Sequence, residues 1–313
     1  MPDLPLPPVK DILDALRLSV LPAAGGAALV VGLFAVLGRW AGAAGSAAAV
    51  VAGFAWGNYT FGALSWEATG RLVPWMSDGP HPAWHWLPRA AVVLVVVGLF
   101  SRWVGLLAAL RLPDHRRWGA GLLVWAARVA AVAVVSVWLV SGPEGEKDPL
   151  LRPALAATML LSWVALDGTA RAAAGGQAAA YLAATLLAAG TVLLYAHSAR
   201  FMELGVVAGC ALFGVAVAAA AAKTDASGAV PAGVAFLPSL LLNGRLLTDS
   251  AVPPASFWLV GLAPLALVPF LVPAVARQNR WLLLSLRTAF ILAPLVTAVA
   301  LAAAAEKLAF EEW

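Results

Sequence analysis

Two histidines and an aspartate lie close together in Arg71–Arg89, the longest break in an otherwise nearly continuous series of apolar runs. His81 and His85 stand four residues apart, a spacing that puts two imidazoles on one face of a helix, where Asp78 could add a third metal ligand. That site requires a helix. Pro82 argues against one, because a proline disfavours the helical conformation of the residue before it. We therefore expect no metal here.

The same stretch is better explained as a loop at the membrane interface, over residues 66–89. Pro88 lacks an N–H group and disfavours a helical conformation of Leu87, so we predict that the loop continues to residue 89. Tryptophan rings are most stable at the depth of the lipid headgroups. The loop would act as an interfacial anchor, a lid or a docking surface for a partner, and the candidate residues are Trp75, Asp78, His81, Trp84, His85 and Trp86.

Charged residues inside apolar runs are the other candidates for chemistry, because an ionised group in a bilayer must be paired, hydrated or near the interface. Arg128 lies near the middle of GLLVWAARVAAVAVVSVWLV and needs an acceptor such as Asp167, exposed carbonyls or a water-filled cavity. It either lines a path for a substrate or ion, or is a structural group satisfied by neighbouring helices. Asp167 also has Arg171 four residues later as a local partner. Arg102 and Arg287 lie nearer to helix ends, and we expect both to snorkel to the interface.

A polar cluster separates two apolar runs in LLYAHSARFMELG. It contains Tyr195, His197, Arg200 and Glu203. A histidine that faces a glutamate at the bilayer edge would titrate near neutral pH and could take part in a proton relay. The alternative is a polar turn with satisfied hydrogen bonds.

The segment 231–249 is the least certain span. Only a short apolar run follows Pro231, Pro238 interrupts it, and Asn243 with Gly244 is a turn signal. A broken or re-entrant helix there would expose carbonyl groups to an ion or substrate, with a binding site beside Asn243, Thr248 and Asp249. The alternative is an ordinary span that continues to Leu247, with Arg245 snorkelling.

The elements that position these residues follow from composition. The chain has 313 residues, of which 62% are hydrophobic and 12% charged, and its mean hydropathy is +0.88. Soluble domains are nearer to about half apolar and about a quarter charged. Because the apolar runs are continuous and long enough to cross a bilayer, we predict an all-α polytopic bundle rather than a β-barrel. The nine or ten expected spans are 18–38, 43–65, 89–110, 119–141, 153–170, 178–198, 201–222, 255–276 and 281–305, with a doubtful one at 230–248.

These spans form one integral membrane domain over residues 1–313, with residues 1–17 as an amphipathic surface segment and no inserted soluble domain. Small residues should mediate helix packing, since lipid gives no hydrophobic drive for helices to associate. Gly53 with Gly57, and Gly205 with Gly209, form two such pairs, which mark contacts within one chain as readily as between chains.

The distribution of charge bears on location. The formal charge is +4, and the absence of a basic block argues against nucleic-acid binding. We expect the protein in a bacterial cytoplasmic membrane. The positive-inside bias then predicts that Arg111–Trp118 is cytoplasmic and that Arg71–Arg89 lies outside.

Three functions remain open, and the sequence carries none of the common catalytic or phosphate-binding motifs. The favoured one is a transporter-like protein for a small solute or proton, whose path would include Arg128, Asp167, His197, Glu203, Asn243 and Asp249. The second is a non-catalytic membrane subunit or scaffold that docks a protein partner, or a second copy, through its Trp-rich loop and small-residue helix faces. The third is an intramembrane enzyme. Enzyme activity is the least supported, and we expect no catalytic residue and no cofactor; the one expected partner common to all three is the lipid bilayer.

Overall fold

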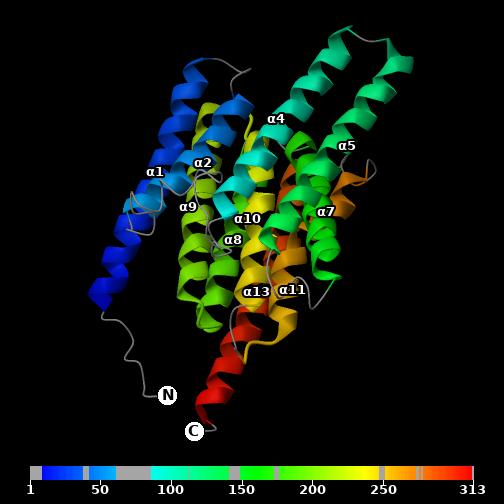
Figure 1. Ribbon diagram of the computed structural model, residues 1–313. Helices are drawn as coiled ribbons and strands as arrows, with labels where there is room; N and C mark the ends of the chain where they lie inside the picture. The colour runs from blue at the N-terminus through cyan, green and yellow to red at the C-terminus, as the bar shows by residue number, and fades with distance from the viewer. Residues whose placement is uncertain are drawn as a thin grey trace, which may run out of the picture.

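The computed structural model describes residues 9–37, 42–60, 86–111, 113–140, 149–172, 176–246, 251–272, 275 and 278–311. Over these ranges the regular elements are all helices, which confirms the predicted all-α fold (Figure 1). In chain order they are α1 (Val9–Val36), α2 (Gly42–Thr60), α4 (Trp86–Arg111), α5 (Asp114–Leu139), α7 (Leu151–Ala172), α8 (Gln177–Tyr195), α9 (Ala199–Ala222), η4 (Ser227–Ala229), α10 (Val230–Leu246), α11 (Pro254–Leu262), η5 (Ala263–Leu271) and α13 (Arg280–Glu311).

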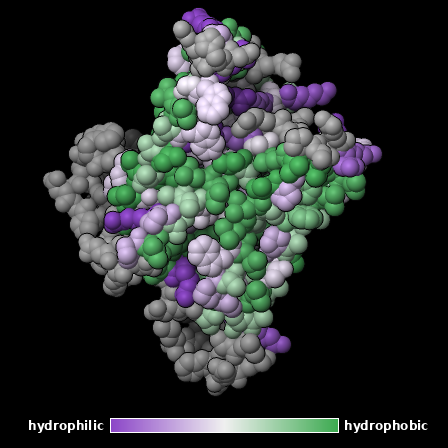
Figure 2. Space-filling view, turned by 90° about the vertical axis from the view of Figure 1, so that its right-hand side faces the viewer, coloured by the Kyte–Doolittle hydropathy of each residue, from purple (hydrophilic) through white to green (hydrophobic). Residues whose placement is uncertain are grey.

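The protein is an integral membrane protein. Within the described ranges, nine helical segments are long and apolar enough to cross a bilayer, and α2 packs beside them against α1 and α9. Large apolar side chains such as Leu110 and Trp103 point out of the bundle, where only lipid can cover them. Figure 2 shows hydrophobic residues over much of the middle of one face, with several hydrophilic residues near its upper end.

Three helices form the buried centre of the bundle. In the apolar stretches of α8, α9 and α10, 61%, 67% and 83% of the residues are buried. In Figure 1 they lie between α1 and α2 on one flank and α4, α5 and α7 on the other. Close approach depends on glycine: a Cβ on Gly205 of α9 would lie 3.3 Å from the Cα atom of Gly190 in α8.

Both predicted glycine pairs are used inside this chain. Gly53 and Gly57 of α2 lie against Ala23 in α1, and Gly57 also lies against Val207 in α9. Gly209, the partner of Gly205, lies against Leu187 in α8. These faces are therefore occupied by neighbouring helices of the same chain.

The uncertain segment 231–249 is continuous as far as the structure describes it. α10 runs unbroken from Val230 to Leu246, with Pro238 inside it. Ser239 and Asn243 bond to carbonyl oxygens one turn earlier, and the Nδ2 of Asn243 donates to the oxygen of Ser239 at 2.9 Å. The ordinary span is therefore what forms, and the alternative of a broken or re-entrant helix is wrong up to Leu246; Thr248 and Asp249 lie outside the described residues.

An irregular helix occurs instead in the next span. α11 changes at Ala263 into a nine-residue 3-10 helix, η5, which contains Pro264 and Pro269. A proline has no N–H group for the α-helical ladder, and 3-10 runs of this length are uncommon. The end of η5 packs on α7, because Gly168 has no side chain to exclude Leu271.

One predicted boundary differs. The loop expected to reach residue 89 ends earlier, because α4 begins at Trp86 and holds Pro88 in its first turn, where a missing N–H group costs nothing. Residues 9–17, expected as part of a surface segment, form a helix continuous with the span that begins at Arg17.

Candidate functional site

A partly open groove of about 530 Å³ lies between α4, α5, α7 and the start of α10. Its lining combines small and apolar residues with three guanidinium groups, those of Arg102, Arg117 and Arg128, and with the carboxylate of Asp167. The volume is within the range of small-molecule sites, roughly 300–1,000 Å³. Charged groups from three predicted spans (Arg102, Arg128 and Asp167) and from the start of α5 (Arg117) therefore face a common space.

Glycines help to keep this space open. A Cβ added at Gly105 of α4 or at Gly121 of α5 would meet no atom within 4 Å. At Gly98, in contrast, the ring of Pro231 from α10 occupies the place where a side chain would lie, so α10 packs directly on α4 at this end of the groove. The groove is thus wide where α4 and α5 face each other and narrow where α10 meets them.

Arg128 and Asp167 form an ion pair at the inner end of the groove. The Nη2 of Arg128 lies 2.7 Å from the Oδ2 of Asp167, and the two side chains are 12% and 13% exposed. The Nε of Arg128 donates to the Oγ of Ser101 at 3.4 Å, and its guanidinium lies 4.7 Å from the ring centroid of Trp163. The expected acceptor of Arg128 is therefore the one that the structure provides.

The environment of this pair explains why two charges remain in a membrane span. A buried carboxylate and guanidinium lose hydration, and mutual attraction offsets that loss only with good geometry and further hydrogen bonds. Ser101 and the face of the Trp163 indole supply additional favourable contacts. Both charged side chains also line the partly open groove.

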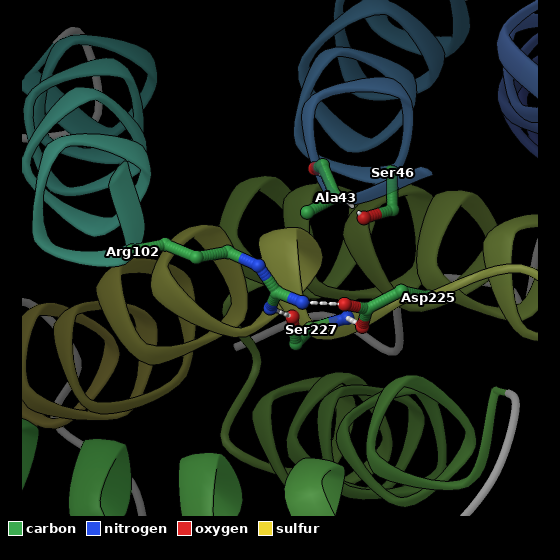
Figure 3. Close-up of polar contacts among 5 residues, drawn as sticks. All are labelled: Ala43, Ser46, Arg102, Asp225 and Ser227. Carbon is green, nitrogen blue, oxygen red and sulfur yellow. Dashed lines mark hydrogen bonds and ion pairs between the residues drawn. The ribbon is translucent and has the colours of Figure 1, made fainter. Parts of the chain in front are cut away.

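A second ion pair joins α4 to the connection between α9 and α10 (Figure 3). The guanidinium of Arg102 binds the Oδ2 of Asp225 and the hydroxyl oxygen of Ser227. The N–H group of Ser227 in turn donates to the Oδ1 of Asp225 at 2.8 Å, so the carboxylate holds its own turn while it binds the arginine. Arg102 was expected to snorkel to the interface; its guanidinium reaches Asp225 in the connection between the ends of α9 and α10.

The connection that carries Asp225 is itself held in place. A Cβ on Gly228 would overlap with the carbonyl oxygen of Ala43 at the start of α2. The hydroxyl of Ser46 donates to that same oxygen at 3.0 Å, beside the Arg102 contacts in Figure 3. Because Ser227 and Gly228 also line the groove, the Arg102 contacts form one of its walls.

Arg117 is the third arginine of the groove and lies in the second turn of α5. Its side chain crosses to α4, where the Nη2 donates to the carbonyl oxygen of Ala109 at 3.2 Å. Along the axis of α4, Arg117 contacts Ala109 and Arg128 contacts Ser101. Arg102 lies between these two contact points, next to Ser101.

Three other predicted path residues, Asn243, His197 and Glu203, are not among the residues that line this groove. Asn243 is buried in α10, where it bonds to its own helix. His197 is exposed in the turn between α8 and α9 and has a left-handed φ of 56°, and Glu203 is half-buried in α9. The N–H groups of His197 and Ser198 donate to the oxygens of Leu194 and Leu193, a helix-ending motif that gives His197 a structural role. Asp249 lies outside the described residues.

The loop candidates can be described only at Trp86. Its ring lies 5.7 Å from that of Trp138 in α5, and the guanidinium of Arg89 lies 4.6 Å from its centroid, so Trp86 packs within the chain. The remaining candidates, Trp75, Asp78, His81, Trp84 and His85, lie outside the described residues.

The expectation for Arg287 is wrong. Instead of snorkelling to the interface, its side chain is buried between α13 and η5, 6.0 Å from the ring centroid of Phe270. Its Nε is buried without a hydrogen-bond partner among the described residues. The irregular backbone of η5 brings Phe270 to this position, which the spacing of charges along the chain does not reveal.

Sequence reasoning missed two members of the groove, Ser101 and Ser227, and it also missed Asp225, which binds Arg102 beside the groove. Asp225 and Ser227 carry a usable signal, because an aspartate two residues before a serine favours a local turn in which the carboxylate accepts the backbone N–H group. Ser101 has no such signal, since its role depends on which helix stands opposite. No protein-family model matches the chain, and no curated protein matches its sequence.

Proposed function

We propose that this protein carries a small solute across the membrane and that the groove between α4, α5 and α7 is part of the path. The observation that carries the proposal is the Arg128–Asp167 pair, which lies inside two membrane spans and lines a cavity of about 530 Å³. Ionisable groups at such depth are costly and are typical of substrate and ion pathways. Arg102 adds a second charged contact to the same space.

The alternative of a subunit or scaffold that docks a partner through small-residue faces has less support. The two glycine pairs that suggested such faces pack against α1, α8 and α9 of the same chain. Charges gathered around a common cavity are also what distinguishes a transport path from a closed, dry bundle. Transport is therefore the stronger proposal.

We also propose a bacterial cytoplasmic membrane as the location, with the turn between α4 and α5 on the cytoplasmic side. The arginines Arg111 and Arg117 flank this short turn. Cytoplasmic loops carry an excess of such cations, which supports this orientation.

Single cysteines in a Cys210→Ala background test whether the groove holds water. Val124→Cys places a thiol in the groove, and Val129→Cys places one nearby on the same helix but on its outer, lipid-covered face. A membrane-impermeant thiol reagent reacts with the hydrated thiolate and should therefore modify the first and spare the second. Adding the reagent from each side in turn shows which side the groove opens to.

Modification at position 124 with none at position 129 would support a hydrated path. If neither position reacts in folded protein, the charges are structural pairs in a dry bundle and transport is rejected. Neither substitution replaces Arg128 or Asp167, so both partners of the ion pair are present during the test.

A further inference from the structure

We infer that the groove binds a single-chain amphiphile with an oxyanion head, a carboxylate or a phosphate, and that Arg102 holds this head by exchanging its Asp225 partner for the ligand. The inference deepens the proposed transport function, on which it rests, because it names the substrate class of the same groove. Two observations support it: the two ion pairs differ in exposure, and the groove is lined by both charged and apolar residues.

The polar part of the lining is suited to an oxyanion. Guanidinium groups present several N–H donors in a planar fork that matches carboxylate and phosphate oxygens. Arg102 and Arg117 are on facing helices, and both line the groove together with the hydroxyl of Ser227. The one carboxylate in the lining, that of Asp167, is already bound to Arg128.

The apolar part of the lining is suited to a hydrocarbon chain. Leu106, Val124, Trp125 and Pro231 provide apolar surface, and Gly105 and Gly121 leave room between α4 and α5. Burial of each CH₂ group favours binding, so even a short chain adds to affinity. A small inorganic anion would leave this surface uncovered.

The two ion pairs differ in how readily they can exchange. The side chains of Arg128 and Asp167 are 12% and 13% exposed, whereas those of Arg102 and Asp225 are 41% and 32% exposed. Breaking a buried pair leaves an uncompensated charge, while an exposed pair contributes little free energy. An incoming oxyanion can therefore replace Asp225 at Arg102 at low cost, and the Arg128–Asp167 pair stays closed.

This exchange gives the two partners opposite effects on binding. Arg102 is the donor to the ligand, so its loss weakens binding. Asp225 competes with the ligand for the same guanidinium, so its loss strengthens binding. A clamp that served only to join α4 to the η4 turn would give no gain in affinity when its carboxylate is neutralised.

The test measures binding to the purified full-length protein in nanodiscs of zwitterionic lipid. The probes are radiolabelled dodecanoate and dodecyl phosphate, compared with dodecanol and dodecylamine as uncharged and cationic analogues of equal chain length. Arg102→Gln and Asp225→Asn are measured beside Arg111→Gln, which removes an exposed arginine from the same helix outside the groove. Size-exclusion profiles establish that each variant is folded.

We expect both anionic probes to bind at least about tenfold more tightly than dodecanol, since hydrogen bonds between charged groups are stronger than those of an uncharged hydroxyl. Arg102→Gln should weaken dodecanoate binding about tenfold, Asp225→Asn should tighten it several-fold, and Arg111→Gln should leave it unchanged. Equal binding of dodecanol or dodecylamine, or unchanged or weaker binding in Asp225→Asn, would overturn the inference.

Two further arms identify the source of the oxyanion. Nanodiscs that contain anionic phospholipid should block dodecanoate binding if a membrane lipid headgroup occupies the site, and should leave it unchanged if a free amphiphile does. Thiol accessibility of the groove is measured without any ligand. A hydrated groove that binds no anionic probe would therefore reject the substrate class and retain the transport proposal, whereas a dry groove would reject both.

Discussion

The centre of the bundle and its α4–α5 side differ in burial and in charge. In α10 83% of the residues of the apolar stretch are buried, whereas in α4 and α5 the value is 28%. The centre contains backbone contacts at glycines and polar groups such as Ser239 and Asn243 that bond to their own helix. The α4–α5 side contains two ion pairs and the groove that they line.

The difference shows where this chain tolerates charge. A close-packed centre has no room for water, so an ion pair there would lose its hydration in full. Beside the centre, two long helices with glycines on their facing sides leave a space that charged groups line. The centre therefore supplies stability, and the flank supplies the polar surface on which the proposed function depends.

The largest effect should come from removing a ring in the centre. Phe236 of α10 is 1% exposed, and its ring centroid lies 4.4 Å from that of Phe54 in α2. Phe236→Ala leaves a cavity and should lower the free energy of unfolding by about 4 kcal/mol. Leu106→Ala in the groove should cost less than about 1 kcal/mol, since that side chain already borders open space. Unfolding in mixed micelles with rising fractions of denaturing detergent measures both, and equal losses would remove the distinction between the two regions.

Breaking the inner ion pair should rank second. Asp167→Asn leaves the Arg128 guanidinium without its counter-charge and should cost about 3 kcal/mol. Changing both residues together, Arg128→Leu with Asp167→Leu, should restore most of that loss, because a well-packed apolar pair often replaces a buried ion pair without penalty. A double variant no more stable than Asp167→Asn would show that the pair does not act as a unit.

Adding one methyl group should have different effects on stability in the centre and in the groove, and both effects should be smaller than those above. A Cβ on Gly214 of α9 would overlap with the carbonyl group of Ala24 in α1, so Gly214→Ala should cost about 2 kcal/mol. Gly121→Ala adds the same methyl group to the groove, where nothing lies within 4 Å, and should be neutral or stabilising by up to about 1 kcal/mol. Thermal unfolding midpoints compare the pair, and a destabilised Gly121→Ala would mean that the groove is filled.

The smallest effect should come from the outer ion pair. Asp225→Asn keeps an oxygen that can accept the N–H group of Ser227 and removes only the charge that faces Arg102. Exposed pairs contribute less than about 1 kcal/mol, so the midpoint of thermal unfolding should change little. A loss as large as that of Asp167→Asn would contradict the assignment of Asp225 as an exchangeable partner.

Much of the architecture could be predicted because it depends on run length and composition. The spans around α4, α5, α8 and α9 were located to within a few residues, since about 20 apolar residues suffice to identify a span. The pairing of Arg128 with Asp167 was also anticipated, because a charge in mid-span needs a counter-charge and few were present.

The features that the sequence did not predict depend on which helices lie side by side. The burial of Arg287 beside Phe270 requires η5 to bend against α13, and the Arg102–Asp225 contact joins residues more than 120 positions apart. At Pro238 the local signals left two alternatives open, and the helix continues because a single proline removes only one hydrogen bond. The groove itself is an arrangement of four elements and could not be read from any one of them.

The 3-10 segment η5 also changes the length that its span can cover. The 18 residues of Pro254–Leu271 would rise about 27 Å as a regular α-helix, at about 1.5 Å per residue. With half of them in the 3-10 form, at about 2.0 Å per residue, the same residues rise about 32 Å. That is enough to cross a hydrocarbon core of about 30 Å, so stretching the backbone compensates for one of the shortest spans in the described chain without adding a residue.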